Sequence, residues 1–329
     1  MKLLSALFAV VAVTASAQDQ WVVYPGGEGP GKGKHVVLLA GDEEYRSEES
    51  MPQLGKILSQ RLGFKCTVLF SVNKTTGEID PNTADNEPGM EALDNADLVI
   101  MGLRFRKWPE EQVKHFVEYY RAGKSIIALR TSTHAFQFAG NHPNKDLNQF
   151  GKKVLGEEWV SHWGNHKKEA TRGVIEPGAE KDPILRGVEN IFGDTDVYEA
   201  YPPEDAKILV RGVVLKGMKP EDAVADYKKK RANDQKEQGV NDPAMPVAWT
   251  REYKNEAGKV NKIFTTTMGS ATDLTNEGFR RLVVNAALSL SGLEVPAKTD
   301  VTLVGDFKPT MYGFNGYIKG VKPADHAAK

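Results

Sequence analysis

The stretch S-I-I-A-L-R-T-S-T-H-A-F, residues 125–136, decides the fold class of this chain. Its first five residues, Ser125 to Leu129, are mostly apolar, which is typical of a short strand buried on both faces of a sheet. The next five, Arg130 to His134, bring together a cation, three hydroxyls and an imidazole. Because the carboxyl ends of strands in an open α/β sheet border the ligand crevice, this polar strand exit predicts a functional site.

Apolar runs and helical stripes alternate on both sides of this stretch, which predicts a parallel sheet with right-handed crossovers. The expected strands are 35–40, 66–70, 97–101, 125–129, 172–175, 206–215, 246–253 and 262–267, and the expected helices are 50–62, 109–123 and 276–290. We expect the strands of the second half to extend the sheet with antiparallel members. The predicted fold class is α/β, a flavodoxin-like three-layer αβα sandwich with a mostly parallel sheet.

The chain divides into four parts. Lys2, an apolar run over 3–13 and a small-residue site at Ala15-Ser16-Ala17 indicate a signal peptide over residues 1–17, so we expect export to the periplasm or the medium. A Gly- and Pro-rich linker over 18–33 precedes one large domain over 34–292. That domain contains a charged insertion over 219–241, expected to be an exposed helix and loop. The tail, 293–329, is expected to lie extended across the surface, and nothing in it indicates chemistry.

The composition of the chain argues against nucleic-acid and membrane partners. The chain has 43 basic and 44 acidic residues, which argues against a nucleic-acid partner held through its phosphates. No stretch after the signal peptide is apolar for long enough to span a membrane. The single cysteine, Cys66, allows no intramolecular disulfide. A small-molecule ligand is therefore expected, and a homo-oligomer stays open.

Three predicted strand exits are polar in the same way: G-D-E-E-Y-R-S-E-E at 41–49, G-L-R-F-R at 102–106 and R-T-S-T-H at 130–134. A flavodoxin-like strand order places these exits next to one another around one crevice. The T-T-T-M-G segment at 265–269 ends a further strand, and its hydroxyls could line the same crevice. As an alternative, the carboxylates of Asp42 and Glu48 would only cap the following helix.

The segment S-H-W-G-N-H, 161–166, places His162 and His166 four residues apart. Imidazoles at this spacing are typical of a metal site, although Gly164 between them disfavours a regular helix. An exposed Trp163 beside them would suit a sugar, whose C–H face stacks on an aromatic ring. The alternative is that Trp163 packs in the core and the histidines are surface residues.

Several chemistries are not expected. The chain has no G-x-x-x-x-G-K-[ST] loop, and no G-x-G-x-x-G follows the first strand, so the usual cradles for nucleotide phosphates are missing. The G-x-S-x-G elbow of serine hydrolases is also missing. A pair of carboxylates for glycoside hydrolysis cannot be selected among so many acidic residues.

Six segments together form a family pattern. They are V-V-L-L-A-G-D-E-E-Y-R (36–46), R-T-S-T-H-A-F (130–136), D-P-I-L-R-G-V (182–188), P-V-A-W-T-R (246–251), I-F-T-T-T-M-G (263–269) and F-R-R-L-V-V-N-A-A-L (279–288). Over most of residues 34–292 the chain thereby resembles the ThuA-like (trehalose utilisation) domain, a branch of the class I glutamine amidotransferase-like superfamily.

The resemblance implies a role in the breakdown of trehalose and related sugars, including 3-keto-glycosides. Amidotransferases of the parent superfamily carry a cysteine at the elbow after the strand. Here that place falls within Thr131 to His134, and Cys66 lies on a different strand, so glutamine hydrolysis is not expected. The chain departs from the family at Ser270 and Asp182, where a histidine commonly stands, and both departures remove possible metal ligands.

Two functions follow as hypotheses. The first is an exported enzyme, of hydrolase or lyase type, that acts on a glycoside or keto-sugar with His134, Glu44 and Arg130 as catalytic residues. A divalent metal such as zinc, bound by His134, His162 and His166, is a variant of it. The second is a non-catalytic sugar-binding or partner-binding domain. The expected substrate contacts are Asp42, Tyr45, Arg46, Arg104, Thr131, Thr133, Trp163 and Thr267.

Overall fold

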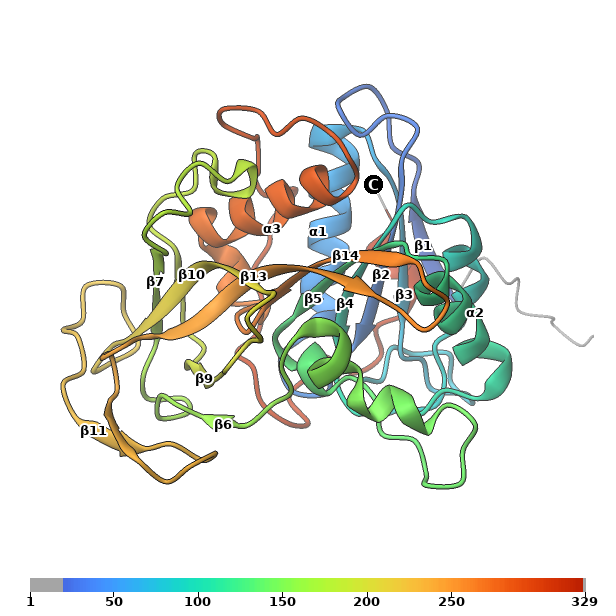
Figure 1. Cartoon of the computed structure of the whole chain (residues 1–329). Helices are drawn as coiled ribbons and strands as arrows, with labels where there is room; N and C mark the ends of the chain where they lie inside the picture. The colour runs from blue at the N-terminus through green and yellow to red at the C-terminus, as the bar shows by residue number, and fades with distance from the viewer. Residues whose placement is uncertain (1–19, 328–329) are drawn as a thin grey trace, which may run out of the picture.

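A ten-stranded mixed sheet forms the centre of the protein in a computed structural model, which describes residues 20–327 (Figure 1). Its five parallel strands lie in the order β3-β2-β4-β5-β14, the flavodoxin-like order. Their bounds are β3 Lys65–Phe70, β2 His35–Gly41, β4 Leu98–Leu103, β5 Ser125–Leu129 and β14 Val260–Thr266. The α/β class and the flavodoxin-like order predicted from the sequence are therefore confirmed.

Antiparallel strands extend the sheet at both edges. On one edge β1 (Trp21–Tyr24), which lies in the segment expected to be a linker, pairs with β3. The other edge continues through β13 (Met245–Lys254), β10 (Lys207–Val214), β7 (Thr171–Ile175) and β8 (Phe192–Gly193). Strand β14 differs from the expectation for the second half because it pairs in parallel with β5, with Thr266 opposite Leu129.

Helices cover both faces of the sheet, as the three-layer prediction requires. On one face α1 (Ser47–Leu62) and α3 (Glu277–Leu290) pack against alternate residues of β2 such as Val36 and Leu38. On the other face α2 (Glu110–Arg121) packs with the intervening residues such as Val37 and Leu39. Figure 1 shows α1 and α3 together and α2 apart from them. This alternation explains why the central strands are continuously apolar.

Short elements connect these layers. Two two-stranded pairs lie outside the main sheet, β6 (Ser161–His162) with β9 (Tyr198–Glu199) and β11 (Lys228–Lys230) with β12 (Glu237–Gly239). The 3-10 helices are Met90–Asn95, Arg130–His134, Lys145–Gln149, Pro183–Leu185, Asp273–Thr275 and Pro323–His326, and Gly151–Leu155 forms a π-helical turn.

The charged insertion, 219–241, forms the β11–β12 ribbon and no helix, which corrects the expectation of an exposed helix. Its Lys229 turns away from solvent, and the ammonium donates hydrogen bonds to the backbone carbonyls of His162 (2.5 Å) and Trp163 (3.0 Å). Figure 1 shows this ribbon at the end of the molecule far from α2. The insertion therefore supports the loop that carries His162.

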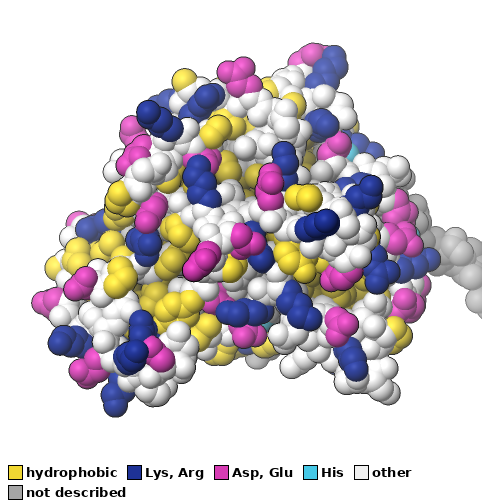
Figure 2. Space-filling view, viewed as in Figure 1, with side chains coloured by type: hydrophobic (Ala, Val, Ile, Leu, Met, Phe, Trp, Pro, Cys, Tyr) yellow, Lys and Arg dark blue, Asp and Glu magenta, His cyan; other side chains and the backbone are white. Residues whose placement is uncertain are grey.

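Basic and acidic side chains are interspersed on the face of the protein drawn in Figure 2, in keeping with the near-zero net charge. Among the helices of residues 20–327, none has the length and apolar character needed to cross a membrane. The signal peptide expected at 1–17 lies outside the described residues.

Candidate functional site

The three polar strand exits, after β2, β4 and β5, adjoin one another and open into a cavity of about 360 Å³. Five predicted site residues line this cavity, together with five that the sequence did not indicate. The lining consists of Glu44, Arg104, Phe105, His134, Trp159, His162, His166, Lys167, Tyr198 and Phe314. The cavity therefore combines imidazoles, a carboxylate, cations and aromatic rings.

Each of these exits places a non-glycine residue in the left-handed region of backbone conformation. The φ angles are 59° at Arg46, 51° at Phe105 and 45° at Arg130. Such a conformation costs about 1 kcal/mol or more for an L residue and is concentrated at functional sites. At the exit of β5 the strained residue is Arg130, whose amide donates to the carbonyl of Met268 at 3.1 Å. The elbow thus carries a guanidinium and not a nucleophile.

Arg130 is 1 % exposed and lies beneath the cavity. Its Nη2 donates to Oδ1 of Asp196 at 2.9 Å, and its Nη1 donates to the carbonyls of Asp196 (2.7 Å) and Thr267 (2.6 Å). The guanidinium also packs against the rings of Tyr198 and Tyr45, 3.7 and 4.6 Å from their centroids. Arg130 therefore fixes Asp196 from below and does not face a ligand.

Asp196 orients both imidazoles of the S-H-W-G-N-H segment. Its Oδ2 lies 2.7 Å from Nδ1 of His162, and its Oδ1 lies 3.0 Å from Nδ1 of His166. Burial alone would raise the pKa of Asp196, but Arg130 and the two imidazoles hold this pKa below its usual range. With Asp196 at both Nδ1 atoms, Nε2 of His162 has no hydrogen-bond partner among the described residues.

Glu44 completes this centre from the exit of β2. Its Oε1 lies 3.3 Å from Nε2 of His166, so that imidazole stands between two carboxylates. Hydrogen bonding to Asp196 and Glu44 raises the pKa of His166 to about 9. In the part of the chain that the structure describes, His162, His166 and Asp196 form a group whose ligand atoms lie within 4.8 Å of one another.

His134 lines the same cavity but does not belong to this group. Its ring lies 5.0 Å from Phe105 and 5.9 Å from Trp159, centroid to centroid. Burial, with the neighbouring charges of Arg104, Arg130 and His162, lowers the pKa of His134 to about 3. The imidazole is therefore neutral near pH 7, where it can accept or donate one hydrogen bond but is a weak base.

The aromatic ring available to a ligand is Trp159 and not Trp163. Trp163 is fully buried, and its Nε1 donates to the carbonyl of Val240 at 2.8 Å. Trp159 is 40 % exposed, and its ring lies 5.7 Å from His162. The structure therefore places Trp163 in the core, which was the alternative to an exposed ring. The exposed ring beside the imidazoles is that of Trp159, four residues earlier.

The remaining predicted contacts lie behind the cavity wall. Asp42 accepts hydrogen bonds from the amides of Glu44 (2.8 Å) and Tyr45 (3.1 Å) and from the hydroxyl of Thr131, and burial raises its pKa to about 6. Tyr45 is buried against Arg130. These residues shape the first and fourth strand exits without facing the cavity.

The predicted contacts Thr133, Thr267 and Arg46 also lie behind the cavity wall. Thr133 is buried and its hydroxyl donates to the carbonyl of Arg130 at 3.4 Å, while Thr267 is buried and its hydroxyl has no partner in the part of the chain that the structure describes. Arg46, 1 % exposed, donates to the carbonyl of Gly313 at 2.6 Å. It binds the C-terminal tail and does not reach the cavity.

Four functional candidates, Trp159, Asp196, Tyr198 and Phe314, escaped the sequence reasoning. The acidic segment G-D-T-D, 193–196, after an apolar residue was a usable signal for Asp196, but its partners lie 30 to 66 residues away. Phe314 belongs to the tail that was expected to carry no chemistry. Nothing local in the sequence connects it with the strand exits.

Cys66 cannot act as a nucleophile in this site. It is buried on β3, and burial raises the pKa of its thiol well above the usual range.

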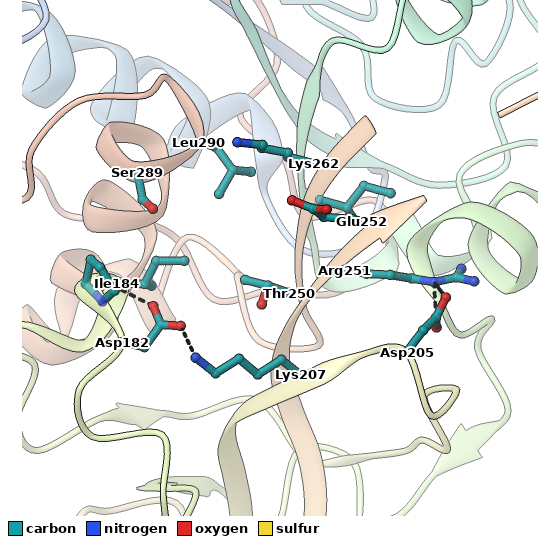
Figure 3. Close-up of a pocket in the computed structure, with 12 residues that line it drawn as sticks. Asp182, Ile184, Asp205, Lys207, Thr250, Arg251, Glu252, Lys262, Ser289 and Leu290 are labelled. Carbon is teal, nitrogen blue, oxygen red and sulfur yellow. Dashed lines mark hydrogen bonds and ion pairs between the residues drawn. The ribbon is translucent and has the colours of Figure 1, made fainter. Parts of the chain in front are cut away.

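A second cavity, of about 520 Å³, lies at the opposite end of the parallel strands, near the start of β14 and the end of α3 (Figure 3). Its charged groups are largely paired: Lys207 lies 2.6 Å from Asp182, and Arg251 lies 2.9 Å from Asp205. No imidazole lines it. The strand-exit cavity is therefore the better candidate for chemistry.

Comparisons with known proteins agree with this architecture. The profile of the family described as ThuA, trehalose utilisation, matches residues 36–288. A solved structure of a putative ThuA-like protein from Parabacteroides merdae is similar with a TM-score of 0.50 at 15 % identity, over 86 % of this chain and 98 % of that one. A second, from Bacteroides uniformis, has a TM-score of 0.44 at 13 % identity, over 81 % and 95 %. No curated protein matches the chain.

Proposed function

The chain belongs to the ThuA family, trehalose utilisation, and on that premise we propose that it is an exported enzyme of carbohydrate breakdown. Its active site is the strand-exit cavity, and its substrate is a glycoside or keto-sugar. One observation carries the proposal: three imidazoles, a carboxylate and an exposed indole converge in a single cavity at the switch point of the sheet.

The donor set fits a divalent cation such as zinc. Imidazole nitrogens and carboxylate oxygens are its usual ligands, at about 2.0–2.2 Å, and metal-bound imidazoles usually donate their second N–H to a carboxylate. Asp196 already occupies the Nδ1 side of His162 and His166. His162, His166 and Asp196, whose ligand atoms lie within 4.8 Å of one another, would hold the ion, and Glu44, 3.3 Å from Nε2 of His166, would accept the second N–H of that imidazole. A bound cation would supply Lewis-acid polarisation of a substrate oxygen or of water.

The chain's own residues then have distinct tasks. Trp159 stacks on the C–H face of a sugar ring, while neutral His134 exchanges a hydrogen bond with a hydroxyl. Arg104, held by an ion pair with Glu43, faces the cavity as a fixed donor. Arg130 positions Asp196 and thereby both imidazoles, so it is a positioning residue and not a catalytic one.

The experiment is metal analysis of the purified mature protein, followed by turnover of trehalose, sucrose and their 3-keto forms. His162→Gln should lower both bound zinc and turnover by at least tenfold. The matched control is His142→Gln, because His142 lies in a turn and does not line the cavity. If His162→Gln left the turnover of every sugar unchanged, the assignment of the active site to this cavity would be refuted.

A non-catalytic sugar-binding domain is the second candidate, favoured by the aromatic lining from Trp159, Phe105 and Phe314. It predicts that calorimetry detects sugar binding to the wild type while no product ever forms, with or without zinc. The same assays therefore separate the two functions. Export to the periplasm or medium is tested by cell fractionation and N-terminal sequencing, with Gln18 as the expected first residue.

A further inference from the structure

Part of the C-terminal tail crosses the cavity region, and we call residues 309–317 the strap. It lies outside residues 36–288, which the family profile covers. The amide of Gly313 donates to the carbonyl of Glu44 at 2.7 Å, the ring of Tyr312 stacks on Tyr45 at 5.1 Å, and Phe314 lines the cavity. The strap therefore contributes directly to the site.

The strap is anchored by hydrogen bonds to the buried Arg46 and to the half-buried Glu49 and Asp194. Arg46 donates from Nη2 to the carbonyl of Gly313 at 2.6 Å and from Nε to the hydroxyl of Thr310 at 3.1 Å. The amide of Thr310 donates to Glu49 at 2.7 Å. The hydroxyl of Tyr312 donates to the carbonyl of Asp194 at 3.0 Å. Hydrogen bonds in which one partner is charged are stronger than neutral ones, so these contacts fix the strap in one position.

Close packing supports the same conclusion. Gly313 has φ 148°, and a Cβ there would lie 2.7 Å from Nζ of Lys167, a residue that lines the cavity. A Cβ at Gly316 would collide with the guanidinium of Arg46. The strap thus follows the cavity rim closely, and a side chain at either position would displace Lys167 or Arg46 from its place.

Phe314 differs from the other aromatic residue of the strap. Tyr312 is buried, whereas Phe314 is 53 % exposed on an otherwise fixed segment. Its ring lies over the guanidinium of Arg104, 5.0 Å from centroid to Cζ, and Arg104 in turn lies 4.6 Å from the centroid of Phe105. A half-exposed ring held in place beside a catalytic cavity contributes little to the core and offers a flat apolar surface to a ligand.

Phe314 and Trp159 belong to different sides of the cavity. Trp159 has ring contacts with His134 and His162, whereas Phe314 packs on the guanidinium of Arg104, which also lies over Phe105. Among the described residues no ring contact joins Trp159 to Phe314. Trp159 and Phe314 are therefore separate platforms, and a ligand with two rings can stack on both.

We propose that the strap completes the ligand site and that Phe314 is a specificity-determining residue, which stacks on a second ring of the ligand while Trp159 holds the first. The inference rests on the proposed function, because it assumes that the cavity binds a sugar. The second ring is the other sugar of a disaccharide or the aglycone of a glycoside. Both present an apolar face that an aromatic ring binds, and Arg104 can donate to their oxygens.

Calorimetric titration of the full mature chain tests this inference. The two-ring probes are trehalose and 4-nitrophenyl α-glucoside, and the one-ring probe is methyl α-glucoside. An aromatic stacking contact of about 0.5–1.5 kcal/mol corresponds to about a three- to tenfold change in Kd. Phe314→Ala should weaken both two-ring probes by this factor and leave the one-ring probe unchanged. Ile318→Ala is the matched control, since Ile318 lies on the same tail, is 56 % exposed and does not line the cavity.

The outcomes separate this inference from the proposed function. If the wild type binds no sugar, the proposed function fails and the inference fails with it. If the wild type binds but Phe314→Ala binds two-ring probes equally well, only the inference fails. Equal weakening of one-ring and two-ring probes also overturns it, because Phe314 would then act on the site as a whole. Thermal unfolding of Phe314→Ala should match the wild type.

Discussion

Replacement of Arg130 by methionine perturbs the centre of the site most sharply. The guanidinium is 1 % exposed and donates to the side chain and carbonyl of Asp196, to the carbonyl of Thr267 and to the hydroxyl of Tyr45. Arg130→Met removes these donors and leaves the buried carboxylate without its permanent countercharge. Because methionine would occupy the same left-handed backbone position, the comparison isolates the guanidinium.

The magnitude follows from the burial of both partners, whose side chains are 1 % and 0 % exposed. Breaking a buried pair by removing one member costs about 3–5 kcal/mol. An unfolding entropy of about 2.1 cal/mol/K per residue, over roughly 300 folded residues, converts this into a fall of about 5–8 °C in Tm. Adding Asp196→Asn to Arg130→Met should recover part of the lost stability, because the buried carboxylate is then no longer present as an uncompensated charge.

The assay is thermal unfolding by circular dichroism at pH 7 in a metal chelator, on the wild type, both single variants and the double variant. Zinc should raise the Tm of Arg130→Met more than that of the wild type, since a cation at the imidazoles would compensate Asp196. A loss below about 1 kcal/mol, or strictly additive single variants, would refute the assigned role of Arg130.

Two further substitutions test other parts of the structure. Burial raises the pKa of Glu48 from its usual value of 4.5 to about 8, and both carboxylate oxygens lack a hydrogen-bond partner among residues 20–327. A carboxyl group with a raised folded pKa destabilises the protein increasingly as pH rises from about 4.5 to 8, so Glu48→Met should increase the free energy of unfolding by up to about 3 kcal/mol at pH 7. Chemical denaturation at pH 4.5 and 7 measures this, and an equal effect at both values contradicts it. Trp159→Ala should weaken binding of methyl α-glucoside about three- to tenfold without changing Tm, whereas the exposed Met311→Ala should change neither; calorimetry and thermal unfolding decide, and unchanged affinity in Trp159→Ala contradicts the platform.

The central part of the fold could be predicted because its signals are local. The apolar runs of β2, β4 and β5 are buried on both faces, and such strands need no long-range information to be recognised. The direction of β14 could not be predicted in this way. Its parallel pairing with β5 depends on which strand lies next to it after the intervening residues 130–259.

The candidate site was predictable in its position but not in its composition. Glu44, His134, His162 and His166 lie on segments with clear local signals, and the sheet topology brings these segments together. Asp196 is defined by contacts with residues 30 to 66 positions away. The strap reaches the site from the other end of the chain.

The ribbon at 219–241 illustrates the same limit. Its charged residues are compatible with an exposed helix or an exposed hairpin. The chain forms a hairpin, in which Lys229 donates hydrogen bonds to the backbone of the loop that carries His162. Only that tertiary contact distinguishes Lys229 from its solvent-facing neighbours Lys228 and Lys230.

A crystal structure of the mature protein grown with zinc and trehalose, with anomalous diffraction recorded at the zinc edge, tests the central claim most directly. We expect an anomalous peak about 2.0–2.1 Å from a nitrogen of His162 and of His166, with a sugar ring stacked on Trp159. A zinc peak or a sugar bound elsewhere, with the strand-exit cavity filled only by water, would contradict the account.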